Sequence, residues 1–192
     1  MAHAKCINVS HLPSVPWKNG SGNTKEIAAF PENAGLDVFI WRVSVAEINR
    51  PSAYSLFPEI DRTQILIAGE RLTLRNHNDQ TKRLLAYESF SFAGEQAWFA
   101  EPEGDCQMLN VMTSRNEAIS EVEFVCGSFE GVGDGRYDLL FVVQGEYICK
   151  DASQRLVCGD FLQPALSLGE TFALSASPDA LMIAIKFSLL SQ

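Results

Sequence analysis

The chain has 192 residues, of which 46% are hydrophobic and 20% charged, a composition typical of folded globular proteins and not of disordered ones. Its formal net charge of -9 argues against nucleic acid and membrane surfaces as partners, because an acidic surface repels phosphate groups. No apolar run approaches the roughly 18 residues of a membrane-spanning helix. We expect one compact protein, or two small fused units, since a domain has roughly 100–200 residues.

The cysteines predict free thiols. Their number is odd and no two form a CxxC pair, and residues 1–10 lack the apolar segment of a secretory signal. The five are Cys6, Cys106, Cys126, Cys149 and Cys158. Because thiols stay reduced in the cytoplasm, a soluble cytoplasmic protein is expected.

Short apolar runs separated by turn signals predict many short strands. Residues 38–45 begin the series with β-branched and aromatic side chains, and residues 45–49 are the best candidate for a helix, of a turn or two at most. Further runs occupy residues 64–67, 72–74, 90–92, 98–99 and 108–112, with turn signals at 76–79, 93–95 and 102–105. No long 3.6-residue period is present, so the pattern favours an all-β sandwich or barrel.

A loose internal repeat divides the chain. Residues 65–70, Ile-Leu-Ile-Ala-Gly-Glu, resemble residues 141–146, Phe-Val-Val-Gln-Gly-Glu. Each segment is followed by a second strand, a turn, a phenylalanine and a closing apolar strand. Two stacked jelly-roll-like β-barrels would explain this order. The predicted halves are 1–115, with an N-terminal loop, and 116–192, fused into one compact unit.

No metal site is predicted. Cupin-type barrels often hold a metal with a His-x-His strand, whose alternate side chains reach the interior together. The histidines here are His3, His11 and His77, and none is paired with another. The cysteine spacing supports no metal site either. We therefore expect neither a metal nor another cofactor.

Three polar clusters are the candidates for a binding site. Residues 16–27 combine an aromatic ring, cations, amides and a carboxylate with glycines that allow close backbone approach to a ligand. Residues 41–44 place Arg42 and Ser44 on one face of an apolar strand, where a buried guanidinium needs a carboxylate from the protein or a ligand. Residues 55–62 carry two acids and Arg62 at a strand edge. Each cluster also has a purely structural interpretation as a turn, an internal ion pair or a strand entry.

Taken together, five short motifs resemble those of the HutD/Ves family. In chain order they are Trp17-Lys18-Asn19-Gly20, Thr24-Lys25-Glu26-Ile27, Trp41-Arg42-Val43-Ser44, Phe57-Pro58-Glu59-Ile60-Asp61-Arg62 and Asn110-Val111-Met112. The resemblance covers the first 115 residues. The chain departs from the family pattern at Ser21 and Glu59, where glycine is usual, and at Met108-Leu109, where aspartate-phenylalanine is common.

The resemblance implies a metal-free bacterial bicupin associated with histidine utilisation, which senses or limits an intermediate such as urocanate or formiminoglutamate. Arg42 or Arg62 would pair with the ligand carboxylate, Lys18 and Asn19 would close over it, and an indole ring would line the site. The full expected set of ligand-binding residues is Trp17, Lys18, Asn19, Glu26, Trp41, Arg42, Ser44, Phe57, Asp61, Arg62 and Asn110.

Two other functions stay open from the sequence. One is a metal-independent isomerase, lyase or hydrolase acting on such a metabolite, with Glu26 or Asp61 as general base and Lys18 as electrostatic stabiliser. The other is a structural or protein-interaction module. The expected partner is a small anionic metabolite, and the sequence leaves a homodimer open.

Overall fold

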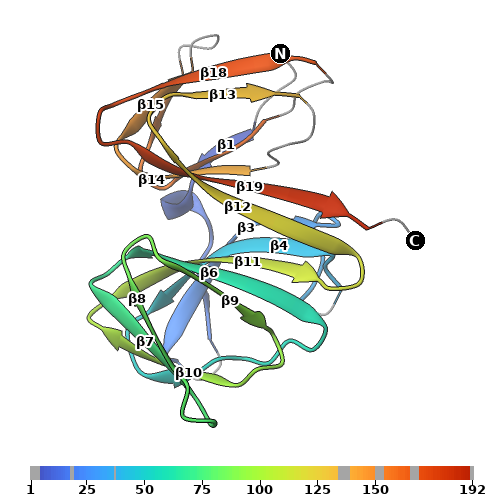
Figure 1. Cartoon of the computed structure of the whole chain (residues 1–192), viewed down its shortest axis with the longest axis vertical. Coiled ribbons are helices and arrows are strands. Elements are labelled where there is room, and N and C mark those ends of the chain that lie inside the picture. The colour runs from blue at the N-terminus through green and yellow to red at the C-terminus, as the bar shows by residue number, and fades with distance from the viewer. Residues whose placement is uncertain are drawn as a thin grey trace. The chain divides into compact units, whose positions relative to one another are not determined.

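The structure, a computed structural model, divides the chain into two compact units. It describes residues 5–17, 20–36, 38–133, 139–149, 154–164 and 169–190. The N-terminal unit comprises Leu12–Ile119 with Leu189–Gln192, and the C-terminal unit comprises Ser120–Ser188 with Met1–His11. Nearly all regular structure in both units is β (Figure 1).

The N-terminal unit is built from two antiparallel sheets. Its large sheet has the order β2 (Val15–Pro16), β3 (Gly22–Phe30), β4 (Trp41–Ile48), β11 (Cys106–Ser114), β6 (Ile60–Ala68) and β9 (Ser89–Ala93). Its small sheet has the order β5 (Ser52–Ala53), β10 (Trp98–Glu103), β7 (Arg71–Asn76) and β8 (Thr81–Leu85).

The C-terminal unit also has two sheets and one short 3-10 helix, η1 (Val9–His11). The five-stranded sheet has the order β1 (Lys5–Asn8), β17 (Asp160–Gln163), β14 (Leu139–Gln144), β19 (Leu181–Leu189) and β12 (Ala118–Cys126). The four-stranded sheet has the order β13 (Phe129–Val132), β18 (Thr171–Ala176), β15 (Glu146–Cys149) and β16 (Gln154–Val157).

The strand orders of the two units match. The run β4-β11-β6-β9 corresponds to β12-β19-β14-β17, and the whole small sheet β5-β10-β7-β8 corresponds to β13-β18-β15-β16. Gly69 and Gly145 occupy the same tight connection, between β6 and β7 and between β14 and β15. The all-β, jelly-roll-like double-cupin prediction is confirmed, with the difference that the sheets of each unit remain separate and do not close into a barrel.

The helix expected at residues 45–49 is wrong. Residues up to Ile48 belong to β4, and both Val45 and Ile48 are buried. Consecutive residues of β4 are buried on both faces of the sheet, so the polar-apolar alternation that marks a strand is missing there. No helix in the described part of the chain is long and apolar enough to cross a membrane.

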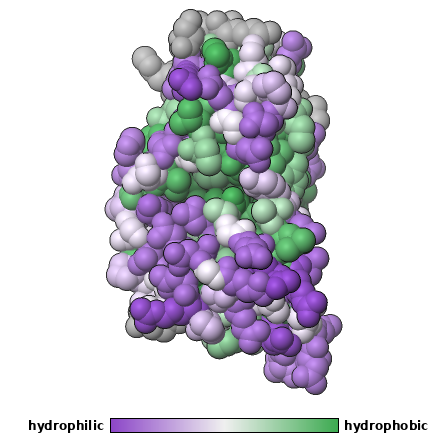
Figure 2. Space-filling model, turned by 90° about the vertical axis from the view of Figure 1, so that its left-hand side faces the viewer, coloured by the Kyte–Doolittle hydropathy of each residue, from purple (hydrophilic) through white to green (hydrophobic). Residues whose placement is uncertain are grey.

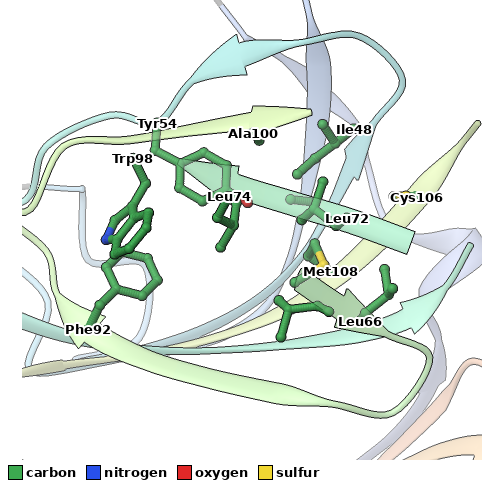
Figure 3. Packing of buried hydrophobic residues seen from close by; sticks show 12 residues of the cluster. Ile48, Tyr54, Leu66, Leu72, Leu74, Phe92, Trp98, Ala100, Cys106 and Met108 are labelled. Carbon is green, nitrogen blue, oxygen red and sulfur yellow. The ribbon is translucent and has the colours of Figure 1, made fainter. Parts of the chain in front are cut away.

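The core of the N-terminal unit lies between its two sheets. Ala46, Leu66 and Met108 from the large sheet pack with Leu72 and Leu74 from the small sheet. Figure 3 shows this aliphatic part of the cluster at one end and three aromatic side chains at the other. The aromatic side chains labelled there are Tyr54, Phe92 and Trp98.

The outer face of the small sheet carries charged residues. Arg71 pairs with Glu103 at 2.6 Å and Arg75 with Glu101 at 2.8 Å, and these are cross-strand neighbours of β7 and β10. Strands β7 and β8 lie on the left of Figure 1, and Figure 2, seen from that side, shows a mainly hydrophilic surface in its lower part. This face is therefore solvated, and the apolar face is turned inward.

Gly69 should tolerate alanine less well than Gly104, because both have a positive φ but only Gly69 is crowded. A Cβ at Gly69 would lie 2.9 Å from the Asp105 carbonyl oxygen, whereas one at Gly104 would meet nothing within 4 Å. We expect Gly104→Ala to lower the free energy of unfolding by about 1–2 kcal/mol and Gly69→Ala by about 2–4 kcal/mol, because overpacking adds to the strain. Equal losses in urea unfolding would contradict this reading of the turn.

Candidate functional site

The inner face of the large sheet changes from apolar to polar toward one end. Ala46, Met108 and Leu66 form the last apolar row across β4, β11 and β6. The next row in register is Ser44, Asn110 and Gln64, and the row after that is Arg42, Met112 and Arg62. On the flanking strands, Glu26 of β3 lies opposite Ser44, and Phe92 of β9 lies opposite Arg62. Period-two alternation thus brings polar groups from distant parts of the chain to one end of the sheet.

Arg62 is the centre of this group, and we refer to the whole as the Arg62 cluster. Its members are Glu26, Arg42, Ser44, Tyr54, Phe57, Arg62, Gln64, Phe92 and Asn110. The Arg62 guanidinium carbon lies 5.3 Å, 5.4 Å and 5.0 Å from the ring centroids of Tyr54, Phe57 and Phe92. Aromatic faces attract a cation at such distances. The three rings therefore hold the guanidinium in place while removing it from water.

The polar contacts of Arg62 leave part of its hydrogen-bonding capacity unused. Nη1 donates to the Ser55 carbonyl oxygen at 3.3 Å, and Nη2 donates to Asn110 Oδ1 at 3.4 Å. Nε is buried and has no hydrogen-bond partner in the part of the chain that the structure describes. The residue is 7% exposed, so an unpaired donor here carries the full desolvation penalty.

No ion pair within the described ranges involves Arg62, although it is a buried cation. Burial is the main cause that lowers the pKa of Arg62 from its usual value to about 10; Tyr54 has the next largest effect and opposes the shift, and the nearby Arg42 charge adds to it. The side chain is therefore still charged at neutral pH. The shift corresponds to about 3 kcal/mol of unfavourable free energy for keeping the charge in this environment.

Arg42, in contrast, has an internal carboxylate partner. Its Nε donates to Glu26 Oε2 at 2.7 Å, and its Nη1 donates to Ser44 Oγ at 3.2 Å. The side chain of Arg42 is 10% exposed and that of Glu26 is 42% exposed, so the pair lies where the cluster reaches solvent. Two guanidinium groups and one carboxylate leave the cluster with one uncompensated positive charge.

Two amides lie beside Arg62 on the inner face of the sheet. Gln64 Nε2 donates to Asn110 Oδ1 at 2.6 Å, and Asn110 Nδ2 donates to the Met108 carbonyl oxygen at 3.3 Å. Gln64 Oε1 and the Tyr54 hydroxyl are buried and make no hydrogen bond of standard geometry among the described residues, although Gln64 lies near enough to Tyr54 for a weak side-chain hydrogen bond to affect the Tyr54 pKa. The Tyr54 pKa is raised, because burial outweighs the opposing effects of Arg62 and Gln64. The cluster therefore presents an unused acceptor and a neutral phenol beside its free charge.

The structure brings six of the expected site residues together: Glu26, Arg42, Ser44, Phe57, Arg62 and Asn110. Two others lie elsewhere, because they occupy odd positions of strands whose even positions face inward. Trp41 stacks on Phe30 with ring centroids 6.1 Å apart, and Asp61 is exposed and pairs with Arg115 at 2.8 Å.

The N-terminal motif is only partly described. Trp17 packs against the core of the N-terminal unit, and its Nε1 donates to Thr24 Oγ1 at 2.7 Å. A Cβ at Gly22 would lie 2.4 Å from the Glu47 carbonyl oxygen and 3.1 Å from the Trp17 ring, so glycine is needed here for the close approach of β4 and leaves room for the indole. Lys18 and Asn19 lie outside the described residues, and their expected closure over a ligand remains a prediction.

Sequence reasoning missed three members of the cluster: Tyr54, Gln64 and Phe92. A signal for Gln64 was present, since it lies two residues after Arg62 in a strand and therefore shares its face. Phe92 of β9 lies opposite Arg62 of β6, and no local sequence pattern predicts this register. Tyr54 follows the two-residue strand β5, which is too short to show a period.

The C-terminal unit replaces the two amides of the cluster with apolar residues. Gln64 of β6 lies opposite Asn110 of β11 in the N-terminal unit. On the corresponding strands of the C-terminal unit, Leu140 of β14 lies opposite Ala184 of β19. Leu140 and Ala184 are part of the hydrophobic core of their unit. At this row of the framework, the described residues are polar in the N-terminal unit and apolar in the C-terminal unit.

The described residues do not fit the metal site that many cupin proteins have. No group of three or more histidine, cysteine, aspartate or glutamate side chains that could hold a metal ion occurs within the described ranges. His11 ends η1 and His77 lies in the turn after β7, and both are exposed. His3 lies outside the described residues.

Two matching jelly-roll-like units define an all-β, cupin-like protein. The chain belongs to the HutD family, whose model matches residues 9–182, and this confirms the resemblance seen in the sequence motifs. Protein Ves of Citrobacter koseri is 34% identical over 143 residues, which cover 73% of each chain.

Solved structures support the fold. HutD from Pseudomonas fluorescens SBW25, in a structure titled "Formate condition", is 23% identical and matches with a TM-score of 0.83 over 98% of this chain and 100% of that one. The bacterial pirin YhhW of Escherichia coli, in complex with nickel(II), is 8% identical and matches with a TM-score of 0.64 over 96% and 98% of the two chains. At these identities the likeness concerns the fold alone.

The amide pair should behave as a coupled unit. Asn110→Ala leaves the buried Gln64 amide without its acceptor, so we expect the free energy of unfolding to fall by about 1–3 kcal/mol. Adding Gln64→Leu removes the stranded amide and introduces the apolar pairing found in the C-terminal unit. The double variant should therefore lose less stability than the sum of the two single variants, measured by urea unfolding. Strict additivity would show that the hydrogen bond between the two amides contributes little.

Proposed function

We propose that the Arg62 cluster binds a small carboxylate-bearing metabolite, and that the protein acts as a regulator or sensor in histidine utilisation. The observation that carries this proposal is the buried charge of Arg62, which meets no carboxylate in the described part of the chain. A ligand carboxylate would supply the missing counter-charge.

The surroundings of Arg62 suit such a ligand. A carboxylate at Nε would complete the hydrogen bonding of the guanidinium, and charge-assisted hydrogen bonds of this kind are among the strongest in proteins. The apolar rings of Tyr54, Phe57 and Phe92 lower the local dielectric constant, which strengthens the attraction. Gln64 Oε1 would accept a hydrogen bond from a donor on the same ligand.

The pathway assignment rests on family membership. Because the chain belongs to the HutD family, an intermediate of histidine breakdown such as urocanate or formiminoglutamate is the first ligand to test. Both molecules carry a carboxylate and a nitrogen donor. A cytoplasmic location is part of the proposal, and the five cysteines are all free of disulfide bonds.

Binding without turnover is the primary proposal because the cluster offers few groups for catalysis. Asp61, one of the two expected general bases, lies on the other face and pairs with Arg115. Glu26, the other, is held by Arg42 at 2.7 Å. Incubating the protein with a bound ligand and following its consumption would separate a sensor from an enzyme.

Replacing Arg62 with methionine should abolish binding without loss of stability. A methionine fills much of the volume without a buried charge, so the free energy of unfolding should stay unchanged or rise by up to about 3 kcal/mol. Affinity for urocanate or formiminoglutamate, whichever binds the wild type in calorimetry, should fall by at least about 100-fold.

The matched control is Arg75→Met, because Arg75 is exposed in an ion pair on the outer face of the same unit. Its affinity should equal that of the wild type. An Arg62→Met protein that binds as tightly as the wild type would refute the proposed site.

The lowered pKa of Arg62 gives the proposal a pH dependence. Below pH about 10 the guanidinium is charged and binds an anion, and above it the proton is lost. Affinity should therefore fall about tenfold per pH unit above 10, whereas an arginine with an ordinary pKa would bind unchanged to pH 12. The same deprotonation relieves the buried charge, so stability contributed by this group rises over that range.

Calorimetric titrations between pH 8 and pH 11, with circular dichroism to confirm folding, measure this profile. Lys18→Gln is the control for titration of this lysine near the same pH. Its affinity for the ligand should still fall above pH 10. A profile that is flat to pH 11 would contradict the role assigned to Arg62.

A further inference from the structure

The two arginines of the Arg62 cluster differ in whether a protein carboxylate neutralises their charge, and this difference affects which ligands can bind. Glu26 forms an ion pair with Arg42, whereas no carboxylate among the described residues forms an ion pair with Arg62. The two arginines share one row of the inner face with Met112 between them, and strands two apart are about 10 Å from each other. A small ligand anchored at Arg62 could therefore extend along the row toward Arg42.

The far end of such a ligand would meet a neutralised cation. Arg42 Nε is already bonded to Glu26 Oε2, and its Nη1 is bonded to Ser44 Oγ. A second ligand carboxylate there would face the charge of Glu26, and repulsion between like charges at about 7 Å alone lowers affinity roughly 10–50-fold at an effective dielectric constant of 20–40. The attraction of Arg42 offsets part of this repulsion, so we expect a net loss of about tenfold. An uncharged or positively charged group would meet no such penalty.

We propose that Glu26 sets the charge of the ligand, so that the cluster selects a molecule with one net negative charge and disfavours a dianion. The favoured class comprises monocarboxylates and dicarboxylates that also carry one positive group. Glu26 acts here as a specificity-determining residue through its ion pair with Arg42. This inference rests on the proposed binding function.

A pair of nearly isosteric probes isolates the effect of charge. Succinamate carries one carboxylate and one amide, whereas succinate carries two carboxylates. Titration of each probe into the labelled protein, followed by NMR on the arginine Nε–H and backbone amide signals, gives both affinities and shows whether the probe reaches Arg62. The wild type should bind succinamate about tenfold more tightly than succinate.

Removal of the Glu26 charge should erase this preference. In Glu26→Gln, Arg42 is free to donate hydrogen bonds to the second carboxylate, so succinate should bind as well as succinamate or better. Glu26→Asp retains the charge and should retain the preference. Glu47→Gln is the matched control, because Glu47 pairs with Lys25 at 3.6 Å on the same sheet and, at an odd position of β4, on the other face.

Arg42→Gln provides a test that does not depend on the folding of Glu26→Gln. It leaves the Glu26 carboxylate without its neutralising cation, so the preference for succinamate should exceed that of the wild type. A preference unchanged in both Glu26→Gln and Arg42→Gln would overturn the inference while leaving the binding function intact. Failure of the wild type to bind either probe at Arg62 would instead refute the proposed function.

Discussion

The burial of the Arg62 charge is the constraint around which the N-terminal unit is arranged. A guanidinium that is 7% exposed and lacks a described carboxylate partner is unfavourable for a protein that needs only stability. Three aromatic rings and two weak hydrogen bonds reduce this penalty without removing it. Buried polar groups with unused bonding capacity mark places where a fold serves something other than its own stability.

The duplicated framework shows what the same strands do without that demand. In the C-terminal unit, Leu140 and Ala184 stand where Gln64 and Asn110 stand in the other unit, and both join an apolar core. Matching strand order shows that the fold itself does not require the amides. Their presence in the N-terminal unit therefore indicates a role at that end of the sheet, which supports the proposal that this unit binds the ligand.

Much of the architecture could be predicted from the sequence, because short apolar runs and turn residues report directly on strands. The Gly-Glu repeat indicated the duplication, and both glycines do occupy the same connection. Adjacency in the sheet was beyond such reasoning. Glu26, Arg62 and Asn110 meet through the registers of four strands, and a register depends on long-range pairing that a single sequence does not display.

The alternation of side chains along a strand separated the site residues correctly where it was applied. It also explains why some expected site residues lie outside the Arg62 cluster. Arg42 and Ser44 were placed on one face, and they do bond to each other. The same rule applied to the adjacent Asp61 and Arg62 requires that only one of them face inward. Including both in one expected site overlooked this alternation, and the structure has Arg62 inward and Asp61 outward.

This division gives the Phe57-to-Arg62 motif two physical roles. On the outer side, Asp61 and Glu95 both bind Arg115, whose backbone N–H donates to the Glu59 carbonyl oxygen at 2.9 Å. Glu59 has a φ of 64°, a left-handed conformation that accounts for the glycine usual in the family at this position.

Gly94, which directly follows β9, fixes the turn between Phe57 and Ile60. Its N–H donates to the Ile60 carbonyl oxygen at 2.6 Å, and its carbonyl oxygen accepts from the Phe57 N–H at 2.9 Å. A Cβ at Gly94 would lie 2.4 Å from the Phe57 carbonyl oxygen, so only glycine allows this approach. The turn so held places the Phe57 ring against the Arg62 guanidinium. The exposed half of the motif is thus structural, and through it the buried Phe57 and Arg62 side chains keep their contact with each other.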